Sequence, residues 1–132
     1  MSEMDVVSVW LGHGQGRERF QELLDHRVSD DGLGEIVPAP FCRAFGIERY
    51  DPDSLGGFYL PRPTRMPVLL YDVAEKARIL PDIDPSTVAN CHVLLYGCAY
   101  AGATKRLTCD GFELWFVGSY PSAVPRSGAN RP

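Results

Sequence analysis

The pattern of apolar residues predicts three buried strands along the chain. Runs rich in β-branched and aromatic residues cover 6–11, 91–100 and 112–120, and glycine, proline or polar residues bound each run. The second and third runs are apolar at both odd and even positions, which is typical of strands covered on both faces. We expect these two strands to pair as an antiparallel hairpin with a long loop, and Trp10 and Phe116 to lie in the core.

Apolar residues at helical spacing predict an amphipathic helix after the first strand. Phe20, Leu23 and Leu24 recur with charged residues between them, so we expect a helix over 17–26 whose apolar stripe lies on the sheet.

Three further segments have the features of short helices. Residues 41–45 should form a helix that Gly46 ends, because glycine accepts the backbone angles of a helix C-cap. Residues 68–80 place apolar side chains at near-helical spacing up to Pro81, which predicts a single helix. Residues 84–87 could open one more helical turn.

The segment between these helices predicts a connector. Residues 48–67 contain four prolines and two glycines, and this composition disfavours a long regular element.

Together the elements predict an α+β fold, with a small, mostly antiparallel sheet and two to three helices packed on it. We expect a single globular domain over 1–120 and a flexible tail over 121–132, where proline, serine, glycine and arginine are frequent.

Composition and charge narrow the class of protein. A chain of 132 residues with 45% hydrophobic and 23% charged residues is typical of one soluble domain. The formal net charge of −4 argues against nucleic-acid binding through a basic surface. No run is long enough to span a membrane, and the acidic start at residues 1–5 lacks the features of a secretory signal. We therefore expect a cytoplasmic protein.

The cysteines and histidines do not form a recognisable site. The four cysteines lie in or beside apolar runs, and we expect reduced, buried thiols at Cys42, Cys91, Cys98 and Cys109. Cys98 and Cys109 could face each other across the expected hairpin. The three histidines are His13, His26 and His92, and no two of them have the spacing of a helical metal site. We expect no metal and no other cofactor.

A glycine-rich loop supplies the main alternative. Gly12, Gly14 and Gly16 lie between the first strand and the first helix, where main-chain N–H groups can hold a phosphate. The spacing fits neither the dinucleotide fingerprint nor the Walker motif, so a plain turn is favoured. The alternative is a small enzyme that uses residues 12–16 for a phosphate or nucleotide ligand, with Cys91 or His92 nearby. A homo-oligomeric scaffold is a third hypothesis.

Acidic loops and aromatic residues favour an interaction surface instead. Acidic residues occur in pairs, and aromatic residues accompany one pair, as binding surfaces for basic partners require. We interpret one set of residues as partner-binding: Tyr50, Asp51, Asp53, Asp30, Asp31, Phe58 and Tyr59. The alternatives are that the acidic residues serve only to form turns and that the aromatic residues pack against the core.

Several short motifs in succession resemble the immunity protein 22 family of bacterial polymorphic toxin systems. They are Val7 to Gly12, Phe45-Gly46-Ile47, Tyr50-Asp51 followed by Asp53, Leu95-Tyr96, and Phe116 to Tyr120. The resemblance implies a small cytoplasmic α+β protein that binds a cognate toxin domain and neutralises it by stoichiometric occlusion, without catalysis.

Overall fold

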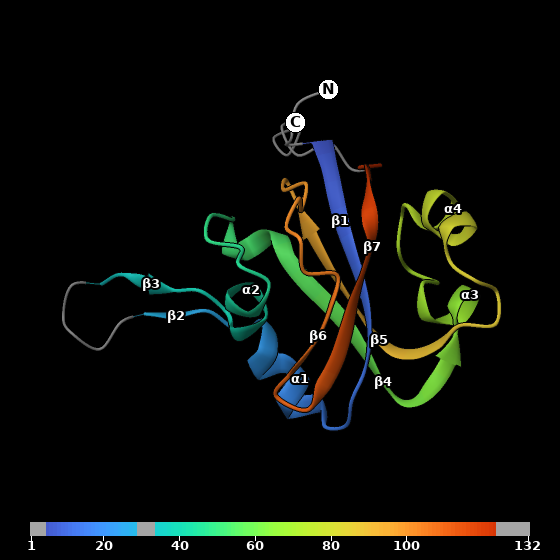
Figure 1. Ribbon diagram of the computed structural model, residues 1–132, viewed down its shortest axis with the longest axis horizontal. Coiled ribbons are helices and arrows are strands. Elements are labelled where there is room, and N and C mark those ends of the chain that lie inside the picture. The colour runs from blue at the N-terminus through green and yellow to red at the C-terminus, as the bar shows by residue number, and fades with distance from the viewer. Residues whose placement is uncertain (1–4, 29–33, 124–132) are drawn as a thin grey trace.

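The computed structural model describes residues 5–28 and 34–123, and a five-stranded antiparallel sheet forms its centre (Figure 1). The strands follow the order β4 (Leu55–Arg65), β5 (Val88–Tyr96), β1 (Val6–His13), β7 (Phe112–Pro121) and β6 (Arg106–Cys109). The three predicted strands correspond to β1, β5 and β7. The α+β prediction is confirmed.

The predicted pairing of β5 with β7 is wrong, because β1 lies between them. Val7 is opposite Tyr96 of β5 on one side and Tyr120 of β7 on the other. The hairpin partner of β7 is the short strand β6, and the tight turn between them is Asp110-Gly111, with positive φ at both residues. An Asp-Gly turn of this kind is a strong hairpin signal that the sequence contains.

In the part of the chain that the structure describes, four short α-helices cover the two faces of the sheet, two on each (Figure 1). The first face carries α1 (Arg17–Leu24) and α2 (Pro40–Ala44), and the second carries α3 (Met66–Leu69) and α4 (Lys76–Ile79). The helices expected over 17–26 and 41–45 are α1 and α2. Gly46 follows α2 with a φ of 73°, which is the conformation that favours glycine at this position.

Alternation along β1 divides its apolar residues between two cores. Trp10 belongs to the first core, on the α1 side, whereas Val7, Val9 and Leu11 belong to the second. Phe116 packs partly buried against the first core, with its ring centroid 5.1 Å from that of Trp10. A sheet covered on both faces explains why β1, β5 and β7 lack the polar alternation of a half-exposed strand.

The expectation of an irregular connector over 48–67 is wrong for most of its length. Asp51 precedes the short 3-10 helix η2 (Pro52–Ser54), and β4 then continues to Arg65. Pro61 and Pro63 fit within β4 because it is an edge strand whose pairing with β5 is interrupted between Tyr59 and Thr64. Proline is tolerated at such positions, since no ladder hydrogen bond is lost.

The single helix expected over 68–80 is also wrong. The apolar side chains that suggested it do reach the second core, but from two short helices, α3 and α4, separated by turns. Glu75 is buried between them and accepts hydrogen bonds from the Tyr96 hydroxyl and the Ala123 N–H. These bonds hold the chain at this point in a turn. The 3-10 helix η3 (Leu80–Asp82) follows α4 directly.

The remaining segments lie at the periphery. Residues 84–87 form a turn, not a helix, closed by a hydrogen bond from Thr87 N–H to the Asp84 carbonyl. The two-stranded ribbon of β2 (Arg27–Val28) and β3 (Ile36–Val37) extends away from the sheet (Figure 1). None of the described helices is long and apolar enough to cross a membrane.

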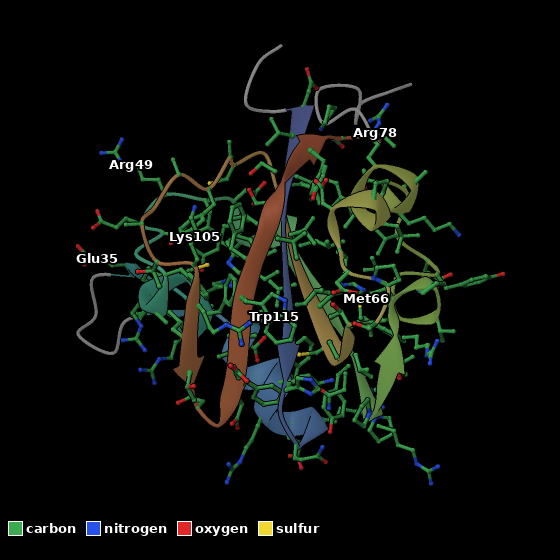
Figure 2. The ribbon with its side chains drawn as sticks, turned by 45° about the vertical axis from the view of Figure 1, so that its right-hand side comes forward. Glu35, Arg49, Met66, Arg78, Lys105 and Trp115 are labelled. Atoms are coloured by element: carbon green, nitrogen blue, oxygen red, sulfur yellow. The ribbon has the colours of Figure 1, made fainter. Side chains whose placement is uncertain are left out.

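The end of the described chain is attached to the body. Pro121 ends β7, and its carbonyl accepts a hydrogen bond from Arg78 Nη1 at 2.8 Å, with Arg78 beside the end of that strand (Figure 2). Ser122 N–H donates to the Asp5 carbonyl. The rest of the tail expected over 121–132 lies outside the described residues.

The adjacent glycines of β4 should respond differently to alanine. A Cβ at Gly57 would lie 2.5 Å from the His92 carbonyl oxygen and 2.8 Å from Phe20, whereas a Cβ at Gly56 meets nothing within 4 Å. We expect Gly57→Ala to lower the free energy of unfolding by about 1–3 kcal/mol, because backbone and core must shift. Gly56→Ala should change it by less than about 0.5 kcal/mol. Equal urea midpoints for the two variants would contradict this packing.

Candidate interaction surface

Two exposed acidic residues precede β4, and one exposed aromatic residue lies in its first half. Asp51 and Asp53 are exposed on either side of Pro52, and the Asp51 carboxylate accepts a hydrogen bond from the Asp53 N–H at 2.9 Å. This bond caps η2 and directs the chain into the sheet. Phe58 follows along β4 with 42% of its surface exposed. We call Asp51, Asp53, Gly56, Gly57 and Phe58 the β4 surface.

The two tyrosines of the expected binding set point inward. The Tyr50 hydroxyl accepts a hydrogen bond from the Ala39 N–H at 2.9 Å, and burial raises the pKa of Tyr50. The Tyr59 side chain is buried, and its hydroxyl accepts a hydrogen bond from the Gly16 N–H at 2.9 Å. Both tyrosines thus anchor the surface to the core. Asp30 and Asp31 lie outside the described residues.

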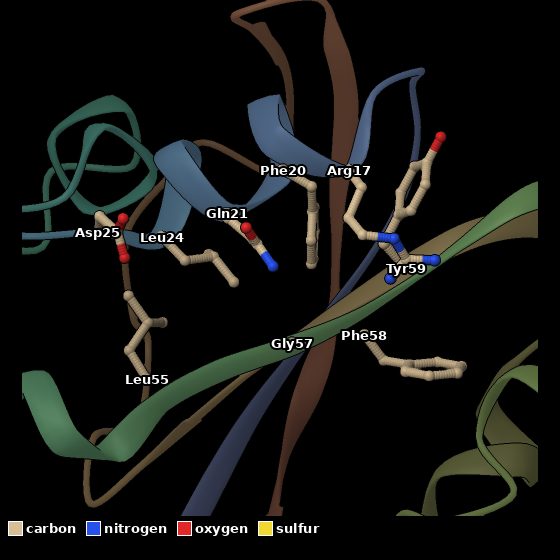
Figure 3. Close-up of a pocket in the computed structure, with 9 residues that line it drawn as sticks. All are labelled: Arg17, Phe20, Gln21, Leu24, Asp25, Leu55, Gly57, Phe58 and Tyr59. Atoms are coloured by element: carbon tan, nitrogen blue, oxygen red, sulfur yellow. The ribbon is translucent and has the colours of Figure 1, made fainter.

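A first groove lies between α1 and β4. Figure 3 shows Phe20, Gln21 and Leu24 pointing from α1 toward the strand, whereas Phe58 points away from the helix. The groove has a volume of about 250 Å³. Arg17 lies at the Tyr59 end, its guanidinium carbon 5.5 Å from the centre of the Tyr59 ring. The groove has a charged rim and an apolar floor.

A second groove lies on the opposite face of β4. It has a volume of about 280 Å³ and is lined by Asp53 and Ser54, by residues 55–57 of β4, and by His92, Leu94 and Tyr96 of β5. Gly56 has no side chain to fill it, and a Cβ placed there would meet nothing within 4 Å. This groove is therefore open over Gly56.

His92 lines the second groove, and the environment of its imidazole is unusual. Only 6% of the residue is exposed, and its Nδ1 has no hydrogen-bond partner among the described residues. Burial lowers the pKa of His92 to about 4, so the imidazole is neutral at physiological pH. The Phe58 ring lies beside it, with centroids 5.8 Å apart.

Main-chain groups of the glycine-rich loop form hydrogen bonds within the protein. Gly14 exchanges two hydrogen bonds with the Asn90 side-chain amide, and the Gly16 N–H is bonded to Tyr59. A Cβ at Gly14 would lie 2.2 Å from Phe112, which gives a packing reason for glycine at this position. Because main-chain groups that a phosphate would need are already bonded, the geometry favours a structural role for residues 12–16.

The buried thiols are poor nucleophiles. Burial raises the pKa of Cys42 and of Cys91 to about 12. A thiol needs a thiolate to react, so neither is activated at neutral pH. Cys91 and the neutral His92 also lie on opposite faces of β5, as adjacent strand residues must. Cys98 and Cys109 are only partly buried.

Sequence reasoning missed several contributors to this region. Gly56 and Gly57 fall within the expected connector over 48–67, and Arg17 and Asp25 fall within the expected helix over 17–26, among its charged residues. The available signal was that residues 55–60 contain no charge and no proline, which is compatible with a strand. Recognising them as an edge required the pairing of β4 with β5.

The fold and this surface define a small α+β protein whose exposed features lie along a sheet edge. Comparison with family models gives the particular family: residues 7–120 match the model described as Immunity protein 22. The chain belongs to this family, and membership supports an immunity role and implies a toxin as the binding partner. Searches of the curated proteins and of the solved structures find no match.

Proposed function

We propose that this protein neutralises a cognate toxin of a polymorphic toxin system by stoichiometric occlusion, in the cytoplasm and without catalysis. The observation that carries the proposal is the family match over residues 7–120. The protein would bind the toxin domain and cover its active site or substrate groove.

The β4 surface is the proposed contact region. Asp51 and Asp53 supply negative charge that can speed the encounter with a basic partner, and Phe58 supplies an exposed aromatic anchor. Tyr50 and Tyr59 support this surface from within. We also propose Asp30 and Asp31 as contacts, on sequence grounds alone.

Co-expression tests the function directly. The protein should restore growth of cells that produce the toxin encoded by the neighbouring gene, and the two chains should purify together in a fixed ratio. Growth arrest despite good expression of this protein, together with separate elution of the two chains, would overturn the proposal.

Truncating Phe58 should weaken the complex. We expect Phe58→Ala to raise the Kd for the toxin about 10- to 100-fold, since exposed aromatic residues at the centre of an interface often dominate its energy. Tyr71→Ala is the matched control, because Tyr71 is 70% exposed but follows α3, away from the start of β4. Titration calorimetry measures both. Equal losses in the two variants would place the contact region elsewhere.

A further inference from the structure

The hydrogen-bond pattern of β5 fixes which main-chain groups of β4 face outward. Gly97 N–H donates to the Val6 carbonyl at 2.9 Å, in register with the pairing of β1 and β5. Bonding alternates along an antiparallel strand, so odd-numbered β5 residues bond to β1, and His92 and Leu94 bond to β4. Their partners are Phe58 and Gly56.

The N–H and C=O groups of Gly57 and Tyr59 consequently point away from β5. The proximity of the His92 carbonyl oxygen to the Cβ position of Gly57 agrees with this register, since it shows that the carbonyl faces β4. Because β4 is the last strand of the sheet formed by residues 5–28 and 34–123, these outward groups face the side where that sheet has no further strand.

The two sheet edges differ in how they are protected. The opposite edge is β6, which has four residues, and Arg106 on that strand is paired with Glu113. Short length and charge are common protections against strand addition. In β4, Pro61 and Pro63 protect the second half, but residues 55–60 contain neither charge nor proline. The first half of β4 is thus open to a further strand.

The surroundings of this half also fit an added strand. The first groove lies on one side of β4 and the second on the other, so alternate side chains of an incoming strand would enter one groove or the other. His92, whose buried Nδ1 has no hydrogen-bond partner among the described residues, is one of the residues that line the second groove.

Charge indicates the kind of strand. Asp25 lines the first groove and Asp53 the second, and both grooves include Leu55. A partner segment should therefore carry a basic side chain at the Leu55 end. A second copy of this chain is disfavoured by repulsion between two bodies of formal charge −4.

We propose that residues 55–60 of β4 receive an extended segment of the toxin as a sixth strand of the sheet. Its main chain bonds to Gly57 and Tyr59, its alternate side chains occupy the two grooves, and it carries a basic residue at the Leu55 end. This inference rests on the proposed function and specifies how the toxin is held.

Amide exchange of the purified complex with the neighbouring gene's toxin domain tests the strand. On binding, the exchange of the Gly57 and Tyr59 amides should slow at least 10-fold, whereas Gly56 and Phe58, already bonded to β5, should change much less. A stable complex with unchanged Gly57 and Tyr59 exchange would overturn strand addition and leave the proposed function intact. Absence of any complex would overturn both. Protection of the same amides without toxin, in a dimer seen by light scattering, would identify a second copy as the occupant and overturn the toxin assignment.

A charge on the edge gives an independent test. Gly56→Lys has room for its side chain and should weaken toxin binding at least 10-fold, because lysine on an edge strand opposes pairing. Val68→Lys adds the same charge on α3, where Val68 is 60% exposed, and should leave affinity within twofold. Unaltered circular dichroism spectra establish that both variants are folded. Equal affinities of the two variants would overturn the proposal.

Discussion

Replacing Trp10 with alanine should lower the free energy of unfolding by about 3–5 kcal/mol, the largest effect expected for a single substitution in this chain. Trp10 is fully buried at the centre of the first core. Its ring lies within 6 Å of four others, with centroid distances of 4.9 Å to Phe41, 5.6 Å to Phe45, 5.4 Å to Tyr100 and 5.1 Å to Phe116. Its removal would leave a cavity between β1, β7 and α2, and the surrounding aromatic rings could fill this cavity only in part.

The second tryptophan is a matched control for this experiment. Trp115 is partly buried on the other face of the sheet, where the Arg106 guanidinium lies 4.9 Å from its ring centre. We expect Trp115→Ala to cost about 1–2 kcal/mol, since solvent can occupy the space that the ring leaves. Urea unfolding measures both variants, and unchanged slopes show that the midpoint difference reflects stability. A smaller loss for Trp10→Ala than for Trp115→Ala would show that the first core is not the main source of stability.

Acidification should destabilise the protein between about pH 6.5 and pH 4 through His92. In the unfolded chain this imidazole takes up a proton near its ordinary pKa of 6.5, but in the folded protein burial lowers that pKa to about 4. The unfolded state therefore binds more protons within this interval, and stability falls as the pH falls. The full effect amounts to about 3 kcal/mol once the pH reaches the folded pKa.

Carboxylates also titrate in acid, so the contribution of His92 must be isolated by difference. His92→Gln removes the titrating group, and the pH dependence of its unfolding free energy should be flatter than that of the natural chain between pH 6.5 and 5. His26 provides the matched control, because it is exposed on the chain after α1. His26→Gln makes the same replacement at an exposed site, and its unfolding is measured in parallel. Parallel curves for the natural chain and His92→Gln would show that His92 is protonated normally in the folded state.

Local sequence patterns predicted the elements whose structure depends mainly on residues close together in the sequence. The strand Val6–His13, the helix Arg17–Leu24 and the positive φ of Gly46 all follow from such local features. The same reasoning failed for β4, because proline excludes only strands whose N–H groups are needed for pairing. Pro61 and Pro63 lie where the β4–β5 ladder is interrupted, and the sequence has no local feature that marks this interruption.

The candidate surface was only partly predictable, for a related reason. Asp51 and Asp53 carry turn chemistry that places them on the exterior, and the structure leaves both exposed. Tyr59 and Phe58 are adjacent aromatic residues with the same local signal, yet the first is buried and the second is 42% exposed. Their difference arises because adjacent strand residues face opposite sides of the sheet, and α1 covers only one of those sides.

Local patterns in the amino-acid sequence are sufficient to predict an α+β domain with strongly apolar strands, and short motifs indicate the family. Both follow from patterns that extend over only a few neighbouring residues. Tertiary structure alone decided that β1 separates β5 from β7, that residues 55–60 lie at an edge, and that two grooves flank them. These features depend on which strands pair across long stretches of chain. That choice is made by the competition of whole apolar faces for burial, which no local pattern encodes.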